Sequence, residues 1–290
     1  MPNSPPTELY ASDDFSGDSY FTVTAMLDNK GAYDIQEGIL VFGYEEDYLE
    51  LKGWDTKFYG NTQTLPEKNK LSYKLDGKSI AFPKGEKTMI SLEAKALPLE
   101  KLSSTHDTFV TLTTCYKYMT NANIPVCINN PQYGLLSNVD ACQNKEIIKE
   151  SGQGGPVAVT EVETLLRGKD NLGKIKPMFL ITVRNKGNGE ALDFFMIQDA
   201  CKASSLGKED LNIVFVEATL GNRVLVCDPY RLKIKKQSAG NAKAIVRCTF
   251  KEGLEPGEIN FETPLNVKLY YGYTNSVSKK ITLNKIQYNK

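Results

Sequence analysis

The chain has 290 residues, 41% of them apolar, and carries 35 basic and 35 acidic side chains. This balance gives no electrostatic reason to expect nucleic acid or an anionic membrane surface as a partner. No run of about 18 apolar residues is present, so no segment of this chain is predicted to span a bilayer. The length and apolar content suit roughly two domains, each with a packed core.

Residues 1–17 are predicted to form an extended tether, because Pro2, Pro5 and Pro6 disfavour a helix. The first residues lack the apolar segment of a signal peptide. The protein is therefore either cytosolic or preceded, in the full-length gene product, by a secretion signal or a membrane anchor. The aspartates and serines of 12–19 could offer oxygen ligands to calcium, but their spacing matches no EF-hand loop. A solvated tether is the prediction, and no metal or cofactor is expected.

Eight stretches rich in β-branched and aromatic residues are predicted to be strands, and many of them alternate apolar with polar residues. They are 20–27, 38–42, 108–115, 157–162, 178–183, 212–216, 244–250 and 265–271. Helical periodicity is scarce, and only 140–150 and 208–211 could each hold a turn or two of helix. This pattern predicts an all-β protein made of two tandem immunoglobulin-like β-sandwich domains.

An aromatic trio in the first half, Trp54, Phe58 and Tyr59, follows a glycine. Exposed aromatic side chains are common at contact surfaces, so these three are the candidate contact surface. Packing in the core or in a loop is the alternative for Trp54. Nearby carboxylates would make the same region a candidate for binding carbohydrate or metal.

His106 is the one histidine of the chain and is predicted to lie in a polar turn before the strand 108–115. A catalytic Ser-His-Asp or Cys-His arrangement would have to use it. No Gly-x-Ser-x-Gly nucleophile elbow accompanies it. Carboxylates are plentiful, but nothing in the sequence singles out a catalytic pair. No catalytic residue is therefore predicted.

The chain has six cysteines, an even number that permits full pairing: Cys115, Cys127, Cys142, Cys201, Cys227 and Cys248. If the polar stretch 119–123 is a hairpin turn, Cys115 and Cys127 oppose each other within disulfide range. Cys227 and Cys248 similarly flank a turn near 237–241, which leaves Cys142 to pair with Cys201. Three disulfides indicate an oxidising compartment or the cell surface. Six reduced, buried thiols in a cytosolic protein are the alternative. Zinc is disfavoured, because no Cys-x-x-Cys is present.

Two landmarks recur at a common offset, which predicts a duplicated unit. Asn29-Lys-Gly31 returns 156 positions later as Asn185-Lys-Gly187, each after a predicted strand whose second residue is phenylalanine. Tyr116-Lys-Tyr118 and Tyr271-Gly-Tyr273 are offset by 155 positions. The repeat predicts one sandwich over residues 18–135 and a second over 156–290.

The stretch between the predicted domains, residues 136–155, is predicted to be a linker. Its glycines at 152–155 are predicted to form an interdomain hinge. A phosphate-binding loop is disfavoured, because no Lys-Ser/Thr follows and a strand rather than a helix comes next.

Three short motifs resemble those of uncharacterised cell-surface proteins from small-genome (DPANN-type) archaea. They are Cys115-Tyr-Lys-Tyr-Met-Thr120, Val126-Cys-Ile128 and Gly152-Gln-Gly-Gly-Pro-Val157. The family typically looks membrane-anchored at its N-terminus, with immunoglobulin-like modules outside the cell. This chain lacks that anchor. The resemblance implies tandem immunoglobulin-like domains at the cell surface, and it brings no catalytic residues.

Together these features predict a non-enzymatic extracellular protein that acts in surface assembly or cell–cell adhesion. Protein partners or self-assembly are expected. A carbohydrate- or metal-binding module is one alternative, and a carboxylate-based hydrolase is another.

Overall fold

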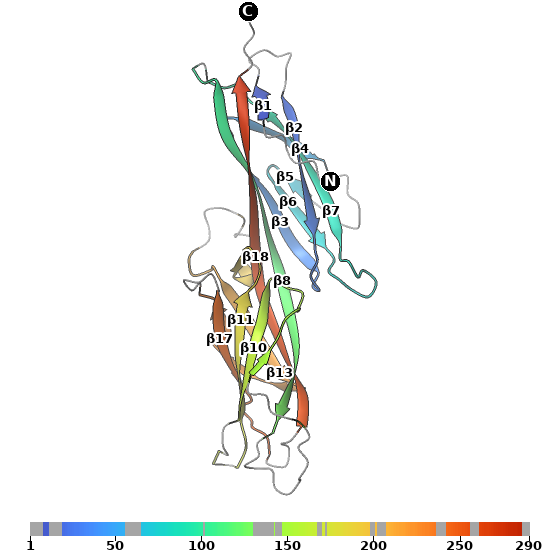
Figure 1. Cartoon of the computed structure of the whole chain (residues 1–290), viewed down its shortest axis with the longest axis vertical. Helices are drawn as coiled ribbons and strands as arrows, with labels where there is room; N and C mark the ends of the chain where they lie inside the picture. The colour runs from blue at the N-terminus through green and yellow to red at the C-terminus, as the bar shows by residue number, and fades with distance from the viewer. Residues whose placement is uncertain are drawn as a thin grey trace, which may run out of the picture. The chain divides into compact units, whose positions relative to one another are not determined.

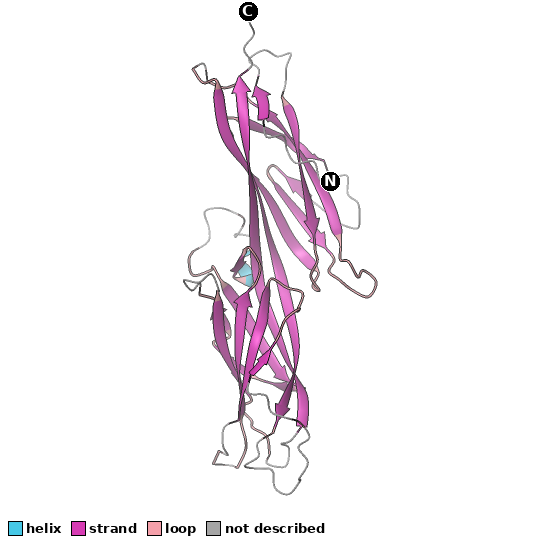
Figure 2. Cartoon of the chain, in the orientation of Figure 1, coloured by secondary structure: helices cyan, strands magenta, loops and turns pink. Residues whose placement is uncertain are grey.

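The computed structural model describes residues 8–11, 19–55, 65–100, 102–129, 142, 147–166, 170–171, 173–197, 201, 207–235, 242–255 and 261–285. Over these residues the regular structure is β-strand apart from one 3-10 turn, as Figure 2 shows. The all-β prediction is therefore confirmed. No helix forms at 208–211, which is a turn, and the described part of 140–150 contains the strand β9 (Ile147–Lys149).

The chain folds into two compact units that are not contiguous in sequence. Unit 1 comprises Met1–Lys117, Gln198–Ala203 and Thr274–Lys290, and unit 2 comprises Tyr118–Ile197 and Ser204–Tyr273. Two long strands, β8 (Thr105–Ile128) and β18 (Phe261–Lys285), contribute residues to both units (Figure 1). The predicted domains, 18–135 and 156–290, therefore differ from the units that form.

The stretch 119–123, predicted to be a hairpin turn, lies inside β8. Ala122 and Ile124 are buried there, whereas Asn121 and Asn123, which alternate with them, are exposed. This is the alternation of a strand with one face in a core. The asparagines are thus outward-facing strand residues rather than turn residues.

Unit 1 has two sheets. The smaller sheet is ordered β2-β7-β4, with β2 at Tyr20–Asp28, β7 at Lys87–Ala96 and β4 at Leu49–Asp55. The larger sheet contains the later part of β18, the earlier part of β8, and the strands β3 (Ile35–Gly43), β6 (Lys70–Leu75) and β5 (Leu65–Glu67). The core between them buries, among others, Phe21, Val23, Phe42, Leu92, Val110, Ile281 and Leu283.

The predicted tether contains a strand. Residues 8–11 form β1 (Glu8–Ala11), which pairs in parallel with β18 from Glu8 opposite Thr282 to Ala11 opposite Lys285. The rest of the predicted tether, residues 1–7 and 12–17, lies outside the described residues.

Unit 2 also has two sheets. One is ordered β15-β17-β11-β10-β9, with β15 at Val226–Asp228, β17 at Lys243–Thr249, β11 at Pro177–Asn185 and β10 at Val157–Leu166. The other contains β14 (Arg223–Val224), β13 (Ile213–Leu220), the earlier part of β18 and the later part of β8, with β16 (Arg231–Lys233) on β13 and β12 (Glu190–Leu192) on β18. Buried residues line the inner faces of both sheets, including Val159, Phe179, Ile181, Val214, Val216, Val267 and Leu269.

The two units repeat the same antiparallel pairings. In unit 1, β2 pairs with β7 and β3 pairs with β8. In unit 2, β11 pairs with β17 and β13 pairs with β18. β8 pairs with β3 in unit 1, and its later part belongs to the larger sheet of unit 2. β18 pairs with β13 in unit 2, and its later part belongs to the larger sheet of unit 1.

Asn29 and Asn185 make equivalent turns. The Oδ1 atom of each accepts a hydrogen bond from the backbone N–H two residues later, at 3.1 Å from Gly31 and 3.0 Å from Gly187. Each Nδ2 group donates to the carbonyl four residues later, at 2.9 Å and 2.8 Å respectively. The duplicated Asn-Lys-Gly of the sequence therefore corresponds to a duplicated local structure.

The predicted interdomain hinge at 152–155 lies within unit 2, and Gly155 in it is closely packed. A Cβ atom on Gly155 would meet the side chains of Thr120 and Tyr271 in unit 2. The Gln153 side chain accepts from the Val159 N–H at 2.9 Å and donates to the Val159 carbonyl at 2.7 Å. The Gln153 side chain thus bonds the backbone of β10 at Val159 as a neighbouring strand would, and it holds the start of β10 in position.

All six cysteines are paired, but two of the three predicted pairs are wrong. The structure joins Cys115 to Cys201, Cys127 to Cys142, and Cys227 to Cys248. Only the last was predicted, from two strands that do oppose each other as β15 and β17. Cys115 cannot reach Cys127, because residues on one straight strand are separated by about 3.3 Å each, or roughly 40 Å in this case.

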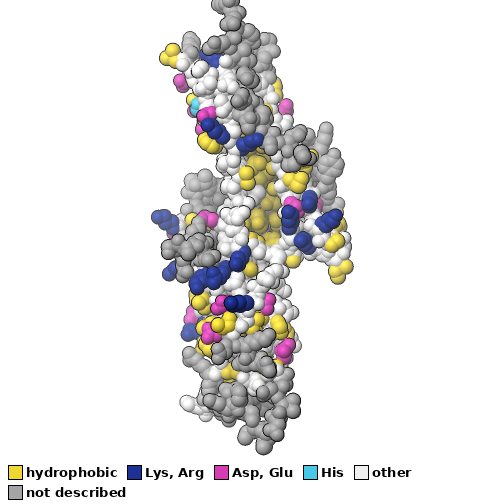
Figure 3. All heavy atoms as spheres, viewed as in Figure 1, with side chains coloured by type: hydrophobic (Ala, Val, Ile, Leu, Met, Phe, Trp, Pro, Cys, Tyr) yellow, Lys and Arg dark blue, Asp and Glu magenta, His cyan; other side chains and the backbone are white. Residues whose placement is uncertain are grey.

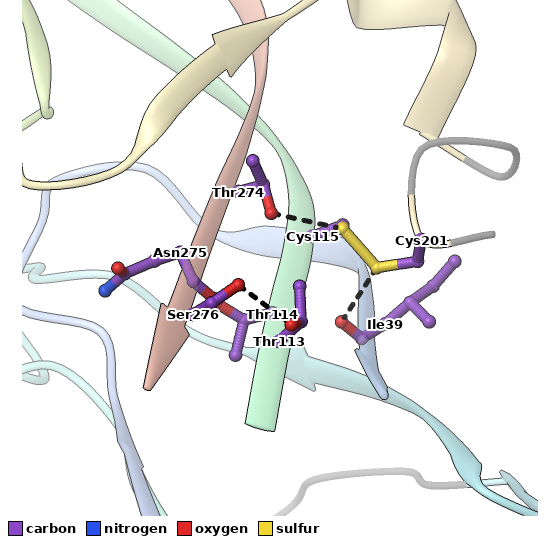
Figure 4. Close-up of a disulfide and its surroundings, with 8 residues drawn as sticks. All are labelled: Ile39, Thr113, Thr114, Cys115, Cys201, Thr274, Asn275 and Ser276. Atoms are coloured by element: carbon purple, nitrogen blue, oxygen red, sulfur yellow. Dashed lines mark hydrogen bonds between the residues drawn. A yellow bond between two sulfur atoms is a disulfide. The ribbon is translucent and has the colours of Figure 1, made fainter. Parts of the chain in front are cut away.

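The Cys115–Cys201 disulfide fastens residue 201 to unit 1 (Figure 4). Cys115 lies on β8, and both cysteines are buried against Ile39 of β3. The Thr274 hydroxyl lies 3.5 Å from the Cys115 sulfur, and the Ile39 carbonyl oxygen lies 3.8 Å from the Cys201 sulfur. The disulfide thus closes an 86-residue loop into the unit 1 core.

Candidate functional site

The predicted contact surface around Trp54 is not an exposed aromatic trio. Trp54 is half-buried on β4, packs against the unit 1 core and donates its indole N–H to the Lys68 carbonyl at 3.1 Å. Its role is therefore packing. Phe58 and Tyr59 lie outside the described residues.

His106 lies in the strand β8 and not in a turn before it. Its Nε2 atom is 2.9 Å from a Glu45 carboxylate oxygen, and its ring stacks on Tyr48 with 3.6 Å between ring centroids. A hydrogen-bonded carboxylate and a stacked phenol ring hold an imidazole in place. The interactions of His106 that the structure gives include no serine or cysteine that could act as a nucleophile.

Among the described residues, no group of three or more His, Cys, Asp or Glu side chains is placed to hold a metal ion. In the same part of the chain, no helix is long and apolar enough to cross a membrane.

Unit 2 carries a continuous cluster of aromatic rings on the outer side of its larger sheet, here named the aromatic patch: Phe194, Phe195, Phe215, Tyr230 and Tyr270. Successive ring centroids are 5.4 to 6.2 Å apart. Phe195 and Tyr230 are the most exposed, at 72% and 65%. An exposed apolar cluster of this kind marks an interaction site more often than isolated surface residues do.

The sheet itself brings part of the patch together. Phe215 of β13 and Tyr270 of β18 are directly opposed across the antiparallel pair. Their neighbours in each strand, Val214, Val216 and Leu269, point into the core. The period of two therefore turns both aromatic rings outward.

A short turn adds the two remaining phenylalanines. The 3-10 turn η1 (Phe194–Met196) begins at Asp193, whose Oδ1 atom accepts from the Phe195 N–H at 3.0 Å. The other Asp193 oxygen accepts from Arg231 Nε at 3.2 Å and from Arg231 Nη2 at 3.0 Å. Asp193 is buried, so this charge-assisted pair fixes the position of the turn.

Gly272 allows η1 to lie close to β18. A Cβ atom at this position would meet Ile197 and would come within 3.2 Å of the Asp193 carbonyl oxygen. The absence of a Cβ atom at Gly272 therefore leaves room for this close approach. The rings of Phe194 and Phe195 are displayed on a pre-organised support.

The chemistry of the patch favours apolar side chains as ligands. Three of the four adjacent ring pairs meet edge to face, with interplanar angles of 85°, 79° and 75°, and the fourth, Phe215–Tyr230, is tilted at 39°. Such rings form ridges and recesses rather than a flat platform. Nearby polar groups are already engaged, because Tyr270 donates to Glu217 at 3.2 Å and Arg231 holds Asp193.

Sequence reasoning missed this site. Tyr270 falls within the predicted strand 265–271, and nothing in the sequence singles out Phe194-Phe195. The one local signal of this turn was Asp193, which stands before two adjacent phenylalanines between predicted strands. Aspartate is a common first residue of such turns, because its side chain caps the backbone N–H groups. The contact of this turn with β13, β16 and β18 is a long-range feature that no local pattern encodes.

No family model matches the chain, and no protein with curated annotation matches it. Among solved structures, the collagen-binding domain of the Erysipelothrix rhusiopathiae surface protein RspB is 7% identical, with 99% of this chain and 96% of that chain covered. The TM-score of 0.16 is too low for that likeness to bear on the fold or the function of this protein.

Proposed function

We propose that this protein is a non-enzymatic, extracellular binding protein that acts in adhesion or surface assembly and contacts protein partners through the aromatic patch of unit 2. The observation that carries the proposal is the pre-organised display of Phe195 by the Asp193–Arg231 pair. Binding at a rigid aromatic site loses little conformational entropy, which is why such residues dominate binding energy at interfaces.

An extracellular location is supported by the three disulfides, because such bonds persist mainly in oxidising compartments. The non-enzymatic assignment is supported by the surroundings of His106, which are a carboxylate and a stacked ring.

A protein ligand is favoured over a sugar for a geometric reason. Sugar rings stack best on flat aromatic platforms, whereas the rings of Phe194, Phe195 and Phe215 meet their neighbours in the patch mostly edge to face. Phe194, Phe195 and Phe215 also carry no hydroxyl group that could bond a sugar. Apolar side chains inserted between edge-to-face rings bury the most area.

The test is binding of labelled full-length protein to the surface of cells that produce it. Phe195→Ala and Tyr230→Ala should each weaken binding at least tenfold, since hot-spot aromatics contribute about 2 kcal/mol or more. The matched control is Phe82→Ala in unit 1, where the phenylalanine is 55% exposed but outside the patch. This control should bind as the unaltered protein does.

Treatment of the cells separates the possible ligands. Loss of binding after protease treatment supports a protein ligand. Loss only after glycosidase treatment would assign the patch to carbohydrate, and binding that is insensitive to Phe195→Ala would reject the patch altogether.

A further inference from the structure

The connection between β6 and β7, residues 76–86, carries an apolar tip on the surface of unit 1. The tip reads Ile80-Ala-Phe-Pro83, and all four residues are exposed. Ile80 is fully exposed and Phe82 more than half exposed. Figure 3 shows apolar side chains at the end of this connection, which Figure 1 places between β6 and β7. Single exposed apolar residues are common, but a contiguous group of them indicates a contact site.

Hydrogen bonds within the loop hold the tip in one shape. The Ser79 N–H donates to the Phe82 carbonyl at 3.1 Å, and the Phe82 N–H donates to the Ser79 hydroxyl oxygen at 3.0 Å. The Gly85 N–H donates to the same Phe82 carbonyl at 3.0 Å. Ile80 and Ala81 therefore occupy the centre of a closed turn. The apolar tip is displayed on a pre-organised loop.

The base of the loop is docked on the turn that follows β2. The Lys78 N–H donates to the Gly31 carbonyl at 2.7 Å. Gly85 has a φ of +71°, and a Cβ atom on it would meet the Asn29 carbonyl oxygen. Only glycine adopts this backbone conformation at such close approach without strain. The loop and the Asn29 turn therefore form one end of unit 1.

Charge is arranged in layers around the apolar tip. Lys78 and Lys84 flank it, both are exposed, and neither enters an ion pair within the described chain. Asp76 and Glu86 lie two residues further from the tip, where the Glu86 carboxylate accepts from the Asp76 N–H at 2.8 Å. Asp34 bonds the backbone of the same base at 2.7 Å. The order from tip to base is therefore apolar, basic and acidic, which the balanced charge of the whole chain conceals.

We propose that this loop attaches unit 1 to the surface of a phospholipid bilayer with anionic headgroups. Ile80 and Phe82 enter the boundary between the headgroups and the acyl chains, and Lys78 and Lys84 lie at the level of the phosphates. The carboxylates of the base stay in water behind the lysines. Attraction to anionic lipids falls off within a Debye length, so the lysines next to the tip outweigh the carboxylates behind them.

Shape and charge favour a bilayer over a protein as the occupant. A protein partner would need a matching pocket to bury a convex tip, whereas the headgroup region of a bilayer accommodates inserted side chains of any shape. The neighbouring turn adds positive charge at the same end of unit 1. Lys30 and Lys87 share one carboxylate, that of Asp28, at 3.7 Å and 3.1 Å, so these three residues carry one excess positive charge.

The bilayer site goes beyond the proposed function and does not rest on it. The aromatic patch belongs to unit 2 and the loop to unit 1. Phe82→Ala should weaken binding to lipid vesicles and leave binding to cells through the patch unchanged. Phe195→Ala should have the opposite effects. Failure of one proposal is thus distinguishable from failure of the other.

Cosedimentation of the full chain with lipid vesicles tests the site. The unaltered protein should bind vesicles of phosphatidylcholine mixed with phosphatidylglycerol, and it should bind phosphatidylcholine alone more weakly. Ile80→Ser should weaken binding about tenfold or more, because it removes one inserted apolar side chain. The matched control is Leu102→Ser, which removes an equally exposed apolar side chain from the turn that follows β7 and should bind as the unaltered protein does.

A second pair of variants tests the role of charge. Lys78→Gln should weaken binding to the mixed vesicles about fivefold, since each lysine near an anionic surface contributes on this scale. The control is Lys251→Gln, at an exposed turn of unit 2, which should have no effect. A protein that binds neither kind of vesicle, or binding that survives both Ile80→Ser and Lys78→Gln, would overturn the proposal. So would an Ile80→Ser effect confined to protease-sensitive binding to cells, because the loop would then contact a protein.

A fluorescent variant covers the case in which Ile80→Ser fails to fold. The emission of Phe82→Trp should shift to shorter wavelength when mixed vesicles are added, and lipids brominated in the acyl chains should quench it, because the indole ring enters the acyl boundary. Leu102→Trp should show neither change. Trp54 packs against the unit 1 core and gives a constant background. An emission of Phe82→Trp that is the same with and without bound vesicles would reject insertion of the loop.

Discussion

At the scale of single residues, the two asparagine turns connect the sheets of each unit. Asn29 of the β2 turn also donates to the Leu75 carbonyl of the other sheet at 3.1 Å. Asn185 accepts from the Tyr273 hydroxyl of the other sheet at 3.2 Å. Each side chain therefore shapes its turn and joins the two layers. Burial raises the pKa of the Tyr273 hydroxyl, which keeps this donor neutral.

The first prediction concerns these asparagines. Asn29→Ala should lower the free energy of unfolding by about 1–3 kcal/mol, because it leaves the buried Leu75 carbonyl without its donor. Asn185→Ala should act similarly in unit 2. Urea unfolding monitored by circular dichroism measures both. The control is Asn275→Ala at an exposed position of β18, which should change stability by less than about 0.5 kcal/mol. Equal effects at all three positions would contradict this role.

The second prediction concerns pH. Hydrogen bonds from Lys280 and Thr282 lower the pKa of Asp107 below its ordinary value of 3.8. A carboxylate whose folded-state pKa is lowered stabilises the fold above its ordinary pKa, and this contribution disappears as the pH falls through the folded-state value. Asp107→Asn should therefore be less stable than the unaltered protein at neutral pH, and the difference should vanish in acid. A stability difference that does not change with pH would contradict this assignment.

The third prediction is that His106→Ala leaves any activity of the protein unchanged. The imidazole is held by Glu45 and Tyr48, so its removal should affect local stability rather than chemistry. Binding to the cell surface, measured beside Phe195→Ala, is the readout. If His106→Ala abolished a measured turnover while the fold stayed intact, the hydrolase alternative would replace the non-enzymatic assignment.

At the scale of strands and disulfides, the sequence predicted what depends on local alternation. The predicted strands 20–27 and 178–183 lie within β2 and β11. The length of β8 was missed, because Asn121 and Asn123 suggest a turn when the buried Ala122 and Ile124 that alternate with them are ignored. Cysteine pairing failed for the same reason. It depends on which strands are adjacent in space, and only the Cys227–Cys248 pair could be found from neighbouring elements.

The fourth prediction tests the disulfides. Peptide mapping of the non-reduced protein should find Cys115–Cys201, Cys127–Cys142 and Cys227–Cys248. Replacing Cys127 and Cys142 by serine should cost about 3 kcal/mol for a loop of about 15 residues. Replacing Cys115 and Cys201 should cost more, because their loop spans 86 residues. Finding Cys115 bonded to Cys127 instead would mean that β8 is broken at 119–123.

At the scale of the whole molecule, neither half of the sequence contains all of one unit. The unit 1 core needs Ile281 and Leu283 from the end of β18, both fully buried. Unit 2 needs the later part of β8, where Ile124 and Val126 are buried. The repeat was visible in the sequence as a common offset. The exchange of strands between the units was not visible in the sequence. An offset between repeats shows that two segments are similar, but it does not show to which unit each strand belongs.

The fifth prediction follows from that exchange. A fragment of residues 1–135 should fail to unfold cooperatively, because it lacks a strand of its larger sheet and leaves the apolar side chains around Val110 without Ile281 and Leu283. Fragments 1–150 and 151–290, refolded together, should associate and recover a cooperative transition, since between them they supply every strand of both units. Calorimetry of each fragment alone and of the mixture measures this. The matched control is the intact chain cleaved between residues 150 and 151 after folding, which should behave as the mixture does. A cooperative transition for 1–135 alone would show that a contiguous domain is sufficient, and that β18 is dispensable to the unit 1 core.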